Sequence, residues 1–133
     1  MAIRYDAGEV ITAMVTPFNE KREIDYPAVE KLARHLADNG SDAILVAGTT
    51  GESPPLTHDE EYELLYAVKG ALSGSAKVIM GAGSNSARTA VDVTKKIQTL
   101  GADAILSVVP YYNKPNQQGM IEHFGAIARS TDL

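Results

Sequence analysis

Residues 43–61 read AILVAGTTGESPPLTHDEE and contain, in order, an apolar run, a glycine-rich turn and the start of a helix. The run Ala43–Ala47 is typical of a strand buried in a parallel sheet. Two adjacent threonines, bracketed by glycines, follow it directly. In the sequence T-H-D-E, Thr57 can cap a helix while Glu60 bonds back to the cap. The stretch therefore predicts a strand–loop–helix unit with two hydroxyls at the carboxyl end of its strand.

The same unit recurs along the chain. The segment Gly40–Leu45 reappears as Gly101–Leu106, a shift of 61 residues, which is the length of about two strand–helix units. The expected strands are Val10–Thr16, Ala43–Ala47, Lys77–Met80 and Ala104–Val109, each buried on both faces. Helices are expected after Asp25 as far as Gly40, from Thr57, from about Ser86 to Leu100, and from near Asn116 to about Arg129.

Two α/β architectures can be built from four such units. A closed eight-unit TIM (β/α)8 barrel takes about 250 residues, so this 133-residue chain would be a half-barrel. An open four-stranded sheet with helices on both faces is the alternative, and the length favours it. Both architectures place ligands beyond the carboxyl ends of the strands.

Composition excludes several classes of function. The chain is 44% hydrophobic and 22% charged, as expected of a globular protein, and its formal charge of -5 argues against a nucleic-acid partner. Cysteine is absent, which excludes thiolate catalysis and cysteine-ligated zinc. The three histidines, at positions 35, 58 and 123, do not have metal-ligand spacing, and we interpret them as surface or capping residues. We expect no metal and no cofactor.

The sequence also bears on location. No apolar run reaches the roughly 18 to 20 residues needed to span a bilayer, so we expect no membrane partner. The first residues, MAIRYDAGE, lack an apolar core of signal-peptide length. A cytoplasmic location is the default expectation.

Three of the loops that follow strands have unusual sequences. Gly48–Glu52 offers two hydroxyls and accessible backbone N–H groups, which suit a carboxylate, whereas the absence of Lys and Arg disfavours a phosphate. This loop could equally be a tight turn in which threonine caps the backbone. The second loop, Gly81–Asn85, is a weak signal for nucleotide binding. In the third, Pro110–Pro115, the pair Tyr111-Tyr112 is more often explained by packing than by chemistry.

Four motifs occur in a specific order: Val15-Thr16-Pro17-Phe18, GTTGES, GAGSN and PYYNKP. Together they resemble the pyruvate-dependent class I aldolases, the family of dihydrodipicolinate synthase and N-acetylneuraminate lyase. PYYNKP favours the dihydrodipicolinate synthase branch. The resemblance covers essentially the whole chain and implies a TIM barrel, of which residues 1–133 would be the N-terminal half, a single domain truncated before the fifth strand.

The resemblance also implies a reaction. Such enzymes bind pyruvate as a Schiff base on a lysine and condense it with aspartate semialdehyde, in lysine and diaminopimelate biosynthesis. By resemblance, Thr50 holds the pyruvate carboxylate, while Thr49 contacts substrate and relays protons. Tyr112 belongs to the same relay and reaches into the neighbouring subunit of a homo-oligomer, a dimer or tetramer. The Schiff-base lysine and a second catalytic tyrosine would lie beyond residue 133, so we expect the 133-residue chain to be inactive alone.

Two other functions stay open: a related pyruvate or 2-keto acid aldolase acting on a sugar acid, and a non-catalytic small-molecule-binding half-barrel. The resemblance also implies a possible effector or interface site, which Ser53, His58, Asn85 and Tyr111 match. Glu61 and Thr89 stand where members inhibited by lysine carry His and Glu. This departure disfavours feedback inhibition by lysine.

Overall fold

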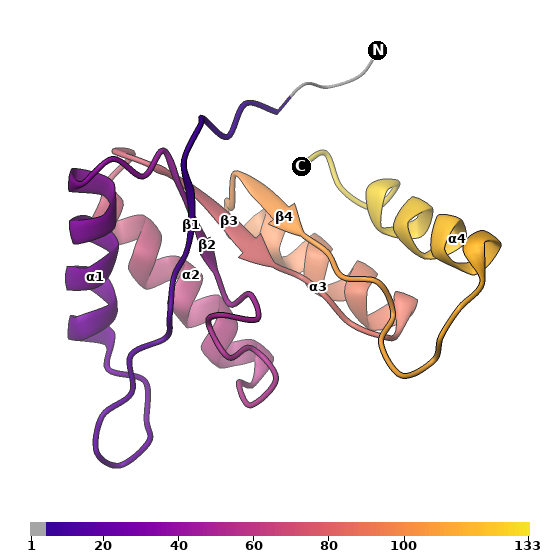
Figure 1. Ribbon diagram of the computed structural model, residues 1–133, viewed down its shortest axis with the longest axis horizontal. Coiled ribbons are helices and arrows are strands. Elements are labelled where there is room, and N and C mark those ends of the chain that lie inside the picture. The colour runs from indigo at the N-terminus through magenta and orange to yellow at the C-terminus, as the bar shows by residue number, and fades with distance from the viewer. Residues whose placement is uncertain (1–4) are drawn as a thin grey trace.

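The structure, a computed structural model, describes residues 5–133. Four strands alternate with four helices, as predicted (Figure 1). The strands are β1 (Ile11–Ala13), β2 (Ala43–Val46), β3 (Lys77–Gly81) and β4 (Ala104–Leu106). The helices are α1 (Tyr26–Asp38), α2 (His58–Leu72), α3 (Ala87–Thr99) and α4 (Gln117–Ala128).

The four strands form one parallel sheet in the order β1-β2-β3-β4. Ile44 of β2 lies opposite Thr12 on one side and Val78 on the other. Because strand-to-strand crossovers are right-handed, a sequential order carries each helix to the same face of the sheet. An open doubly wound sheet would instead reverse its order to place helices on both faces. The observed order is that of half a TIM barrel, and the open-sheet alternative is wrong.

The hydrophobic core lies between the sheet and the helices. Side chains from β2 and β3 and from α1 and α2 are fully buried there; the largest include Ile44, Val46, Val78, Met80, Val29, Leu64, Leu65 and Val68. Burying one such side chain is worth about 1.5–3 kcal/mol. The helical faces that the sequence patterns predicted therefore hold the sheet in place.

The opposite face of the sheet buries a small cluster, Ala43, Ile79 and Ala104, but is exposed on its two edge strands. Ile11 of β1 is 50% exposed and Leu106 of β4 is 51% exposed, whereas β2 between them is almost wholly buried. The prediction that all four strands are buried on both faces is therefore wrong for β1 and β4. Both are also shorter than expected, because within the described sheet each pairs with a single neighbouring strand.

The internal repeat has a structural counterpart. Asp42 donates its N–H to the Val10 carbonyl (2.9 Å), and its carboxylate accepts the Val10 N–H (2.9 Å). Asp103 makes the same reciprocal pair with Val78, at 2.9 and 2.8 Å. The two backbone hydrogen bonds that Asp42 accepts, from Val10 and Glu9, hold its pKa below the ordinary value. Each aspartate thus ties the start of its own strand to the preceding strand.

The helices begin close to the predicted positions, and each begins at a capping residue. Asp25, Thr57, Ser86 and Asn116 each accept a backbone N–H from the first turn of α1, α2, α3 and α4. One prediction on the helices is wrong: His123 is buried rather than exposed, because the face of α4 that carries His123 and Ile127 packs inward, and α4 lies against α3. No helix of residues 5–133 combines the length and the apolar composition needed to cross a membrane.

A close backbone approach joins the carboxyl ends of β2 and β3. A Cβ atom at Gly81 would lie 2.1 Å from the carbonyl oxygen of Ala47, well inside contact distance. Ala47 itself has a φ of 51°, a left-handed conformation that turns the chain out of β2. The two strands can therefore come together at this edge because residue 81 has no side chain.

We expect Gly81→Ala to destabilise the full-length gene product by about 1–3 kcal/mol, since the new methyl group meets backbone that cannot rotate away. Gly70→Ala is the matched control: a Cβ there meets no atom within 4 Å, in the last turn of α2. This variant should gain up to about 1 kcal/mol from helix propensity. Urea unfolding measures both, and a Gly81→Ala protein as stable as the wild type would contradict the close approach.

Candidate functional site

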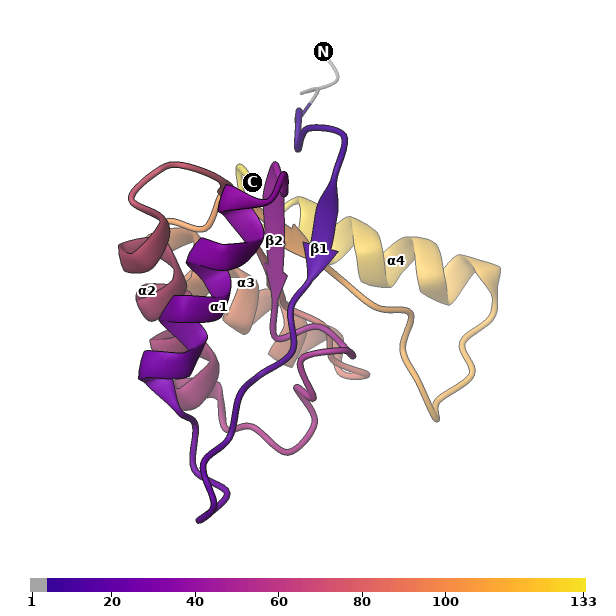
Figure 2. The ribbon, with the colours of Figure 1, turned by 60° about the vertical axis from the view of Figure 1, so that its left-hand side comes forward.

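The loops that follow the four strands gather at one edge of the sheet, at the bottom of Figures 1 and 2. Parallel strands require this, because all their carboxyl ends point the same way. The edge brings together the loops after β2, β3 and β4, which are the three segments with unusual sequences.

The turn after β2 is fixed by backbone hydrogen bonds. Gly51 donates its N–H to the Gly48 carbonyl (3.1 Å), and Glu52 donates to the Thr49 carbonyl (3.1 Å). The buried hydroxyl of Thr16, which follows β1, donates to the Gly51 carbonyl at 2.6 Å. A Cβ at Gly51 would crowd Met14 and Ala47 backbone atoms at 3.1–3.2 Å. The turn is therefore held from two strands at once.

The two threonines of the turn face outward. Thr49 and Thr50 are both exposed, and neither hydroxyl has a hydrogen-bond partner within residues 5–133. The turn is closed by main-chain groups instead, so the alternative in which threonine caps the backbone does not describe this turn. Two hydroxyls, each able to donate and accept, are thus available to a ligand.

A cleft of about 530 Å³ opens beside this turn. Of the predicted site residues, Thr49, Ser53, His58 and Tyr111 line it, together with Glu61, Ser84, Thr89 and Ser107. Thr50, Asn85 and Tyr112 belong to the same three loops but are outside this lining. The structure therefore brings the hydroxyl pair and the possible effector residues to one edge, with a single cleft between most of them.

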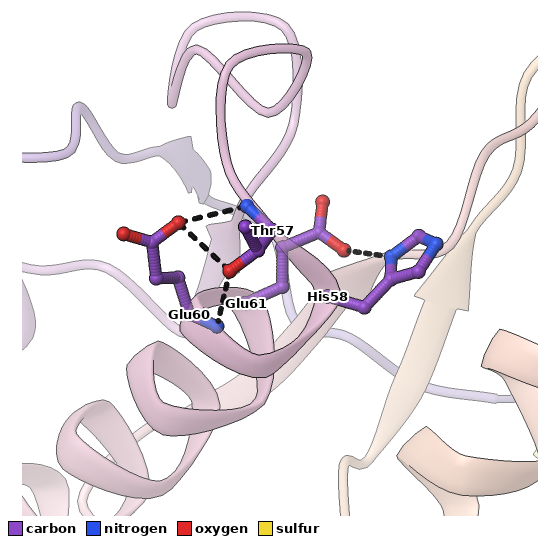
Figure 3. A network of polar contacts seen from close by, with 4 residues as sticks. All are labelled: Thr57, His58, Glu60 and Glu61. Carbon is purple, nitrogen blue, oxygen red and sulfur yellow. Dashed lines mark hydrogen bonds and ion pairs between the residues drawn. The ribbon is translucent and has the colours of Figure 1, made fainter.

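One wall of the cleft is the first turn of α2, shown in Figure 3. Thr57 accepts the Glu60 N–H at 3.2 Å, and Glu60 accepts the Thr57 N–H at 2.8 Å, which is the predicted capping box. These bonds from Thr57 hold the pKa of Glu60 below its ordinary value. The cap stabilises the start of α2 by about 0.5–2 kcal/mol.

Glu61, the next residue, has the opposite electrostatic environment. Its side chain is buried, and burial raises its pKa although the His58 ring, 2.9 Å away through Nδ1, favours the charged form. His58 also stacks on Tyr62, with ring centroids 6.3 Å apart. The pair places a carboxyl and an imidazole, two groups able to exchange a proton, in the wall of the cleft.

The tyrosine loop after β4 projects away from the chain. Tyr111 is 57% exposed and Tyr112 is 93% exposed, so the interpretation of this pair as packing residues is wrong within this chain. Tyr112 has a φ of 68° and lies at the apex of a three-residue turn, closed by the Asn113 N–H and the Tyr111 carbonyl at 2.8 Å. Such a turn with a positive central φ is rare and strained.

The cleft contains neither a lysine nor a cluster of metal-ligating side chains among the described residues. Within residues 5–133 no lysine lines the cleft; Lys77 is at the opposite end of β3, with its ammonium 5.1 Å from the centre of the Tyr5 ring. The same residues contain no group of three or more His, Asp or Glu side chains that could hold a metal ion. The catalytic nitrogen that the resemblance implies is thus not in this cleft.

Sequence reasoning assigned no site role to Thr16 or Ser107. Thr16 was visible as part of Val15-Thr16-Pro17-Phe18, but its contact with Gly51 spans 35 positions and has no local signature. Ser107 lines the cleft with a buried hydroxyl that has no partner within the described part of the chain. The sequence placed Ser107 inside the expected strand Ala104–Val109, whereas β4 ends at Leu106, so no local signal marked it as a loop residue.

The neighbouring glutamates of Figure 3 predict opposite pH effects on stability. The pKa of Glu61 is higher in the folded protein than in the unfolded chain, where it is about 4.3. Its carboxyl group therefore stabilises the fold below about pH 4.3, and this contribution is lost as pH rises through the folded pKa. The pKa of Glu60 is lower in the folded protein than in the unfolded chain. Its carboxylate therefore stabilises the fold above the unfolded pKa, and this contribution is lost as pH falls through the folded pKa. As pH rises above about 4, Glu61→Gln should therefore become more stable relative to wild type. Glu60→Gln should lose stability relative to wild type as pH rises toward about 4 from more acidic values.

Urea unfolding of the full-length gene product at several pH values measures both differences, and each variant serves as the control of the other. Two differences with the same slope against pH would contradict the assigned environments.

The chain was compared with known proteins. The model of the dihydrodipicolinate synthetase family matches residues 6–133. A 4-hydroxy-tetrahydrodipicolinate synthase of Synechococcus sp. is 57% identical over 126 residues, which are 95% of this chain and 41% of the relative. A dihydrodipicolinate synthase from Bacillus anthracis superimposes with a TM-score of 0.95 at 48% identity, over 98% of this chain and 44% of that one.

The chloride-inhibited dihydrodipicolinate synthase of Acinetobacter baumannii, solved in complex with pyruvate, matches with a TM-score of 0.94 at 37% identity, over 96% of this chain and 44% of that one. The chain thus spans about two fifths of the length of the proteins it matches. Four ordered motifs, a sequential parallel sheet and a family model that covers nearly every residue agree: the chain belongs to the dihydrodipicolinate synthetase family.

Proposed function

We propose that this chain is the N-terminal half of a pyruvate-dependent synthase with a (β/α)8 barrel, which condenses pyruvate with aspartate semialdehyde to 4-hydroxy-tetrahydrodipicolinate. The observation that carries the proposal is the turn after β2, where Thr49 and Thr50 present two hydroxyls without partners among residues 5–133. Family membership supports the choice of reaction. The cytoplasmic location expected from the sequence stays a prediction.

In this proposal Thr50 binds the carboxylate of pyruvate. Its hydroxyl and backbone N–H are both donors, and the glycines on either side of the threonine pair leave room for a small anion to approach. The hydrogen bonds that fix Gly51 and Glu52 hold the turn before a ligand arrives. A rigid donor pair of this kind binds an anion without first having to be ordered.

Thr49 and Tyr112 then move protons. Forming an imine, adding an aldehyde and closing a ring each require proton transfers, and a threonine hydroxyl can accept and donate at once. Thr49 lies in the cleft beside Tyr111, whereas Tyr112 stands outside it and is 93% exposed. A tyrosine so exposed is available to a second copy of the chain, so we assign its contact to the neighbouring subunit of a homo-oligomer.

The imine needs a lysine that this cleft does not supply. A lysine near its ordinary pKa of about 10.4 is almost entirely protonated at neutral pH, and burial in a dry site lowers that value. The open face of the sheet, with Ile11 and Leu106 half exposed, offers no such burial by itself. We assign the lysine and the second catalytic tyrosine to the other half of the barrel.

The remaining lining residues form a candidate regulatory or interface subsite. Ser53, His58 and Tyr111 face the same cleft as Glu61 and Thr89, and Asn85 lies in an adjacent loop. The half-buried contact between His58 and Glu61 already uses a carboxylate oxygen of that wall. Glu61 and Thr89 in this wall are the departures that disfavour feedback inhibition by lysine.

Thr49→Val tests the relay. In the full-length gene product we expect turnover to fall by about 10²–10⁴-fold, the usual contribution of a positioned proton-transfer group. Pyruvate should still form an imine, since the donors at Thr50 remain. Steady-state kinetics with pyruvate and aspartate semialdehyde, and borohydride trapping followed by intact mass, measure the two effects. Wild-type turnover in Thr49→Val would exclude the relay role. If the unmodified protein acted only on the aldehydes used by sugar-acid aldolases, one of these would replace aspartate semialdehyde as the proposed substrate.

Tyr112→Phe tests the contact between subunits. Turnover should fall strongly, and further than in Tyr111→Phe, which removes a hydroxyl from the adjacent residue and serves as the matched control. If Tyr112 acts in the partner's site, oligomers that mix Tyr112→Phe subunits with subunits lacking the imine lysine should recover some activity, because one complete site can form. Mixed oligomers that assemble and stay inactive would place Tyr112 in its own subunit's site.

A further inference from the structure

Within residues 5–133, the strained turn that carries Tyr112 is tied to the loop after β3 through the side chain of Asn113. The side-chain amide of Asn113 donates from Nδ2 to the backbone carbonyl of Asn85 at 2.8 Å. A weaker contact of 3.5 Å runs the other way, from Asn85 Nδ2 to Asn113 Oδ1. These contacts join the loop after β4 to the loop after β3 across 28 positions of sequence.

The same residue closes the turn itself. The backbone N–H of Asn113 is the donor to the Tyr111 carbonyl, so Asn113 fixes the apex through its main chain and the whole loop through its side chain. Tyr112, at that apex, is 93% exposed, so within residues 5–133 its own side chain has little contact that could hold a φ of 68°. A left-handed conformation of a bulky residue persists where surrounding contacts enforce it.

The acceptor, the carbonyl of Asn85, lies next to the start of α3. Asn85 directly precedes Ser86, the cap of α3, and the Ser86 N–H is itself held by the Ser84 hydroxyl at 3.1 Å. At the other side of the tyrosine loop, Asn116 caps α4 by accepting the Gly119 N–H at 2.9 Å. The tyrosine loop thus ends at the cap of α4, and Asn113 ties it to the residue that precedes the cap of α3.

We propose that Asn113 is a positioning residue that holds Tyr112 in its outward, strained conformation through the hydrogen bond from Asn113 Nδ2 to the Asn85 carbonyl. The catalytic consequence rests on the proposed function, in which Tyr112 takes part in proton transfer; the conformational claim does not. Asparagine suits the task because one side chain provides a donor at short reach, which aspartate of the same shape lacks.

The test uses the full-length gene product with three variants. Asn113→Asp keeps the shape and removes the donor, and Asn113→Ala removes the whole side chain. Gln118→Ala is the matched control: it also deletes an exposed amide near the loop, but that amide donates to Glu122 on its own helix α4 at 2.9 Å. Should the alanine variant fold poorly, the aspartate variant decides.

Two readouts separate position from chemistry. The protein is labelled with 3-fluorotyrosine, and the fluorine resonance of Tyr112 is assigned by its loss in Tyr112→Phe. In Asn113→Asp we expect this resonance to move toward that of the free amino acid, and turnover to fall by about tenfold while the KM for pyruvate changes less than about twofold. Gln118→Ala should leave both unchanged.

A Tyr112 resonance that stays at its wild-type position in Asn113→Asp would overturn the proposal, whatever the turnover does. An equal movement in Gln118→Ala would overturn it too, because the effect would then be general to the loop. If the wild type shows no condensation of pyruvate with aldehydes while the resonance still moves in Asn113→Asp alone, the positioning role stands and the proposed function fails.

Discussion

The constraint on which the rest of the structure depends is the sequential parallel pairing of β1, β2, β3 and β4. Parallel pairing sends all carboxyl ends to one edge, and right-handed crossovers in a sequential order put the helices on one face. The core can then form between that face and the helices, while three loops meet at the edge. Gly81 marks how tight this arrangement is, since a single methyl group there would strike the Ala47 carbonyl.

At that edge the backbone is fixed and the side chains are free. The Thr16 hydroxyl holds Gly51, and the Asn113 amide holds the loop after β4 to Asn85. The groups presented to solvent, Thr49 and Thr50 in one loop and Tyr112 in the other, are left without such ties. Positive φ angles at Ala47, Glu52 and Tyr112 show that the chain is bent into uncommon conformations to reach this state. Exposed polar groups on a rigid frame are what binding and proton transfer require.

Two consecutive glutamates of α2, Glu60 and Glu61, have opposite electrostatic environments. Glu60 faces the capping threonine, whose N–H and hydroxyl both donate to its carboxylate and lower its pKa. Glu61 is turned into the protein, where burial raises its pKa. Consecutive residues of a helix are rotated by about 100° from each other, so two identical side chains meet different surroundings. His58 contacts the buried member of the pair through Nδ1 and brings an imidazole to the cleft wall.

The sequence by itself determined the order of strands and helices, the capping residues and the placement of unusual loops after strands. These depend on contacts between residues within about four positions of each other, such as Thr57 with Glu60, and on hydrophobic periodicity. The ordered motifs also indicated the family, and with it the threonine pair and Tyr112 as candidates. The buried His123, the open face of β1 and β4 and the outward Tyr111 and Tyr112 went against local expectation. Only the tertiary structure decided these, together with the contacts of Thr16 with Gly51 and of Asn113 with Asn85, because each depends on which distant segment packs against the residue.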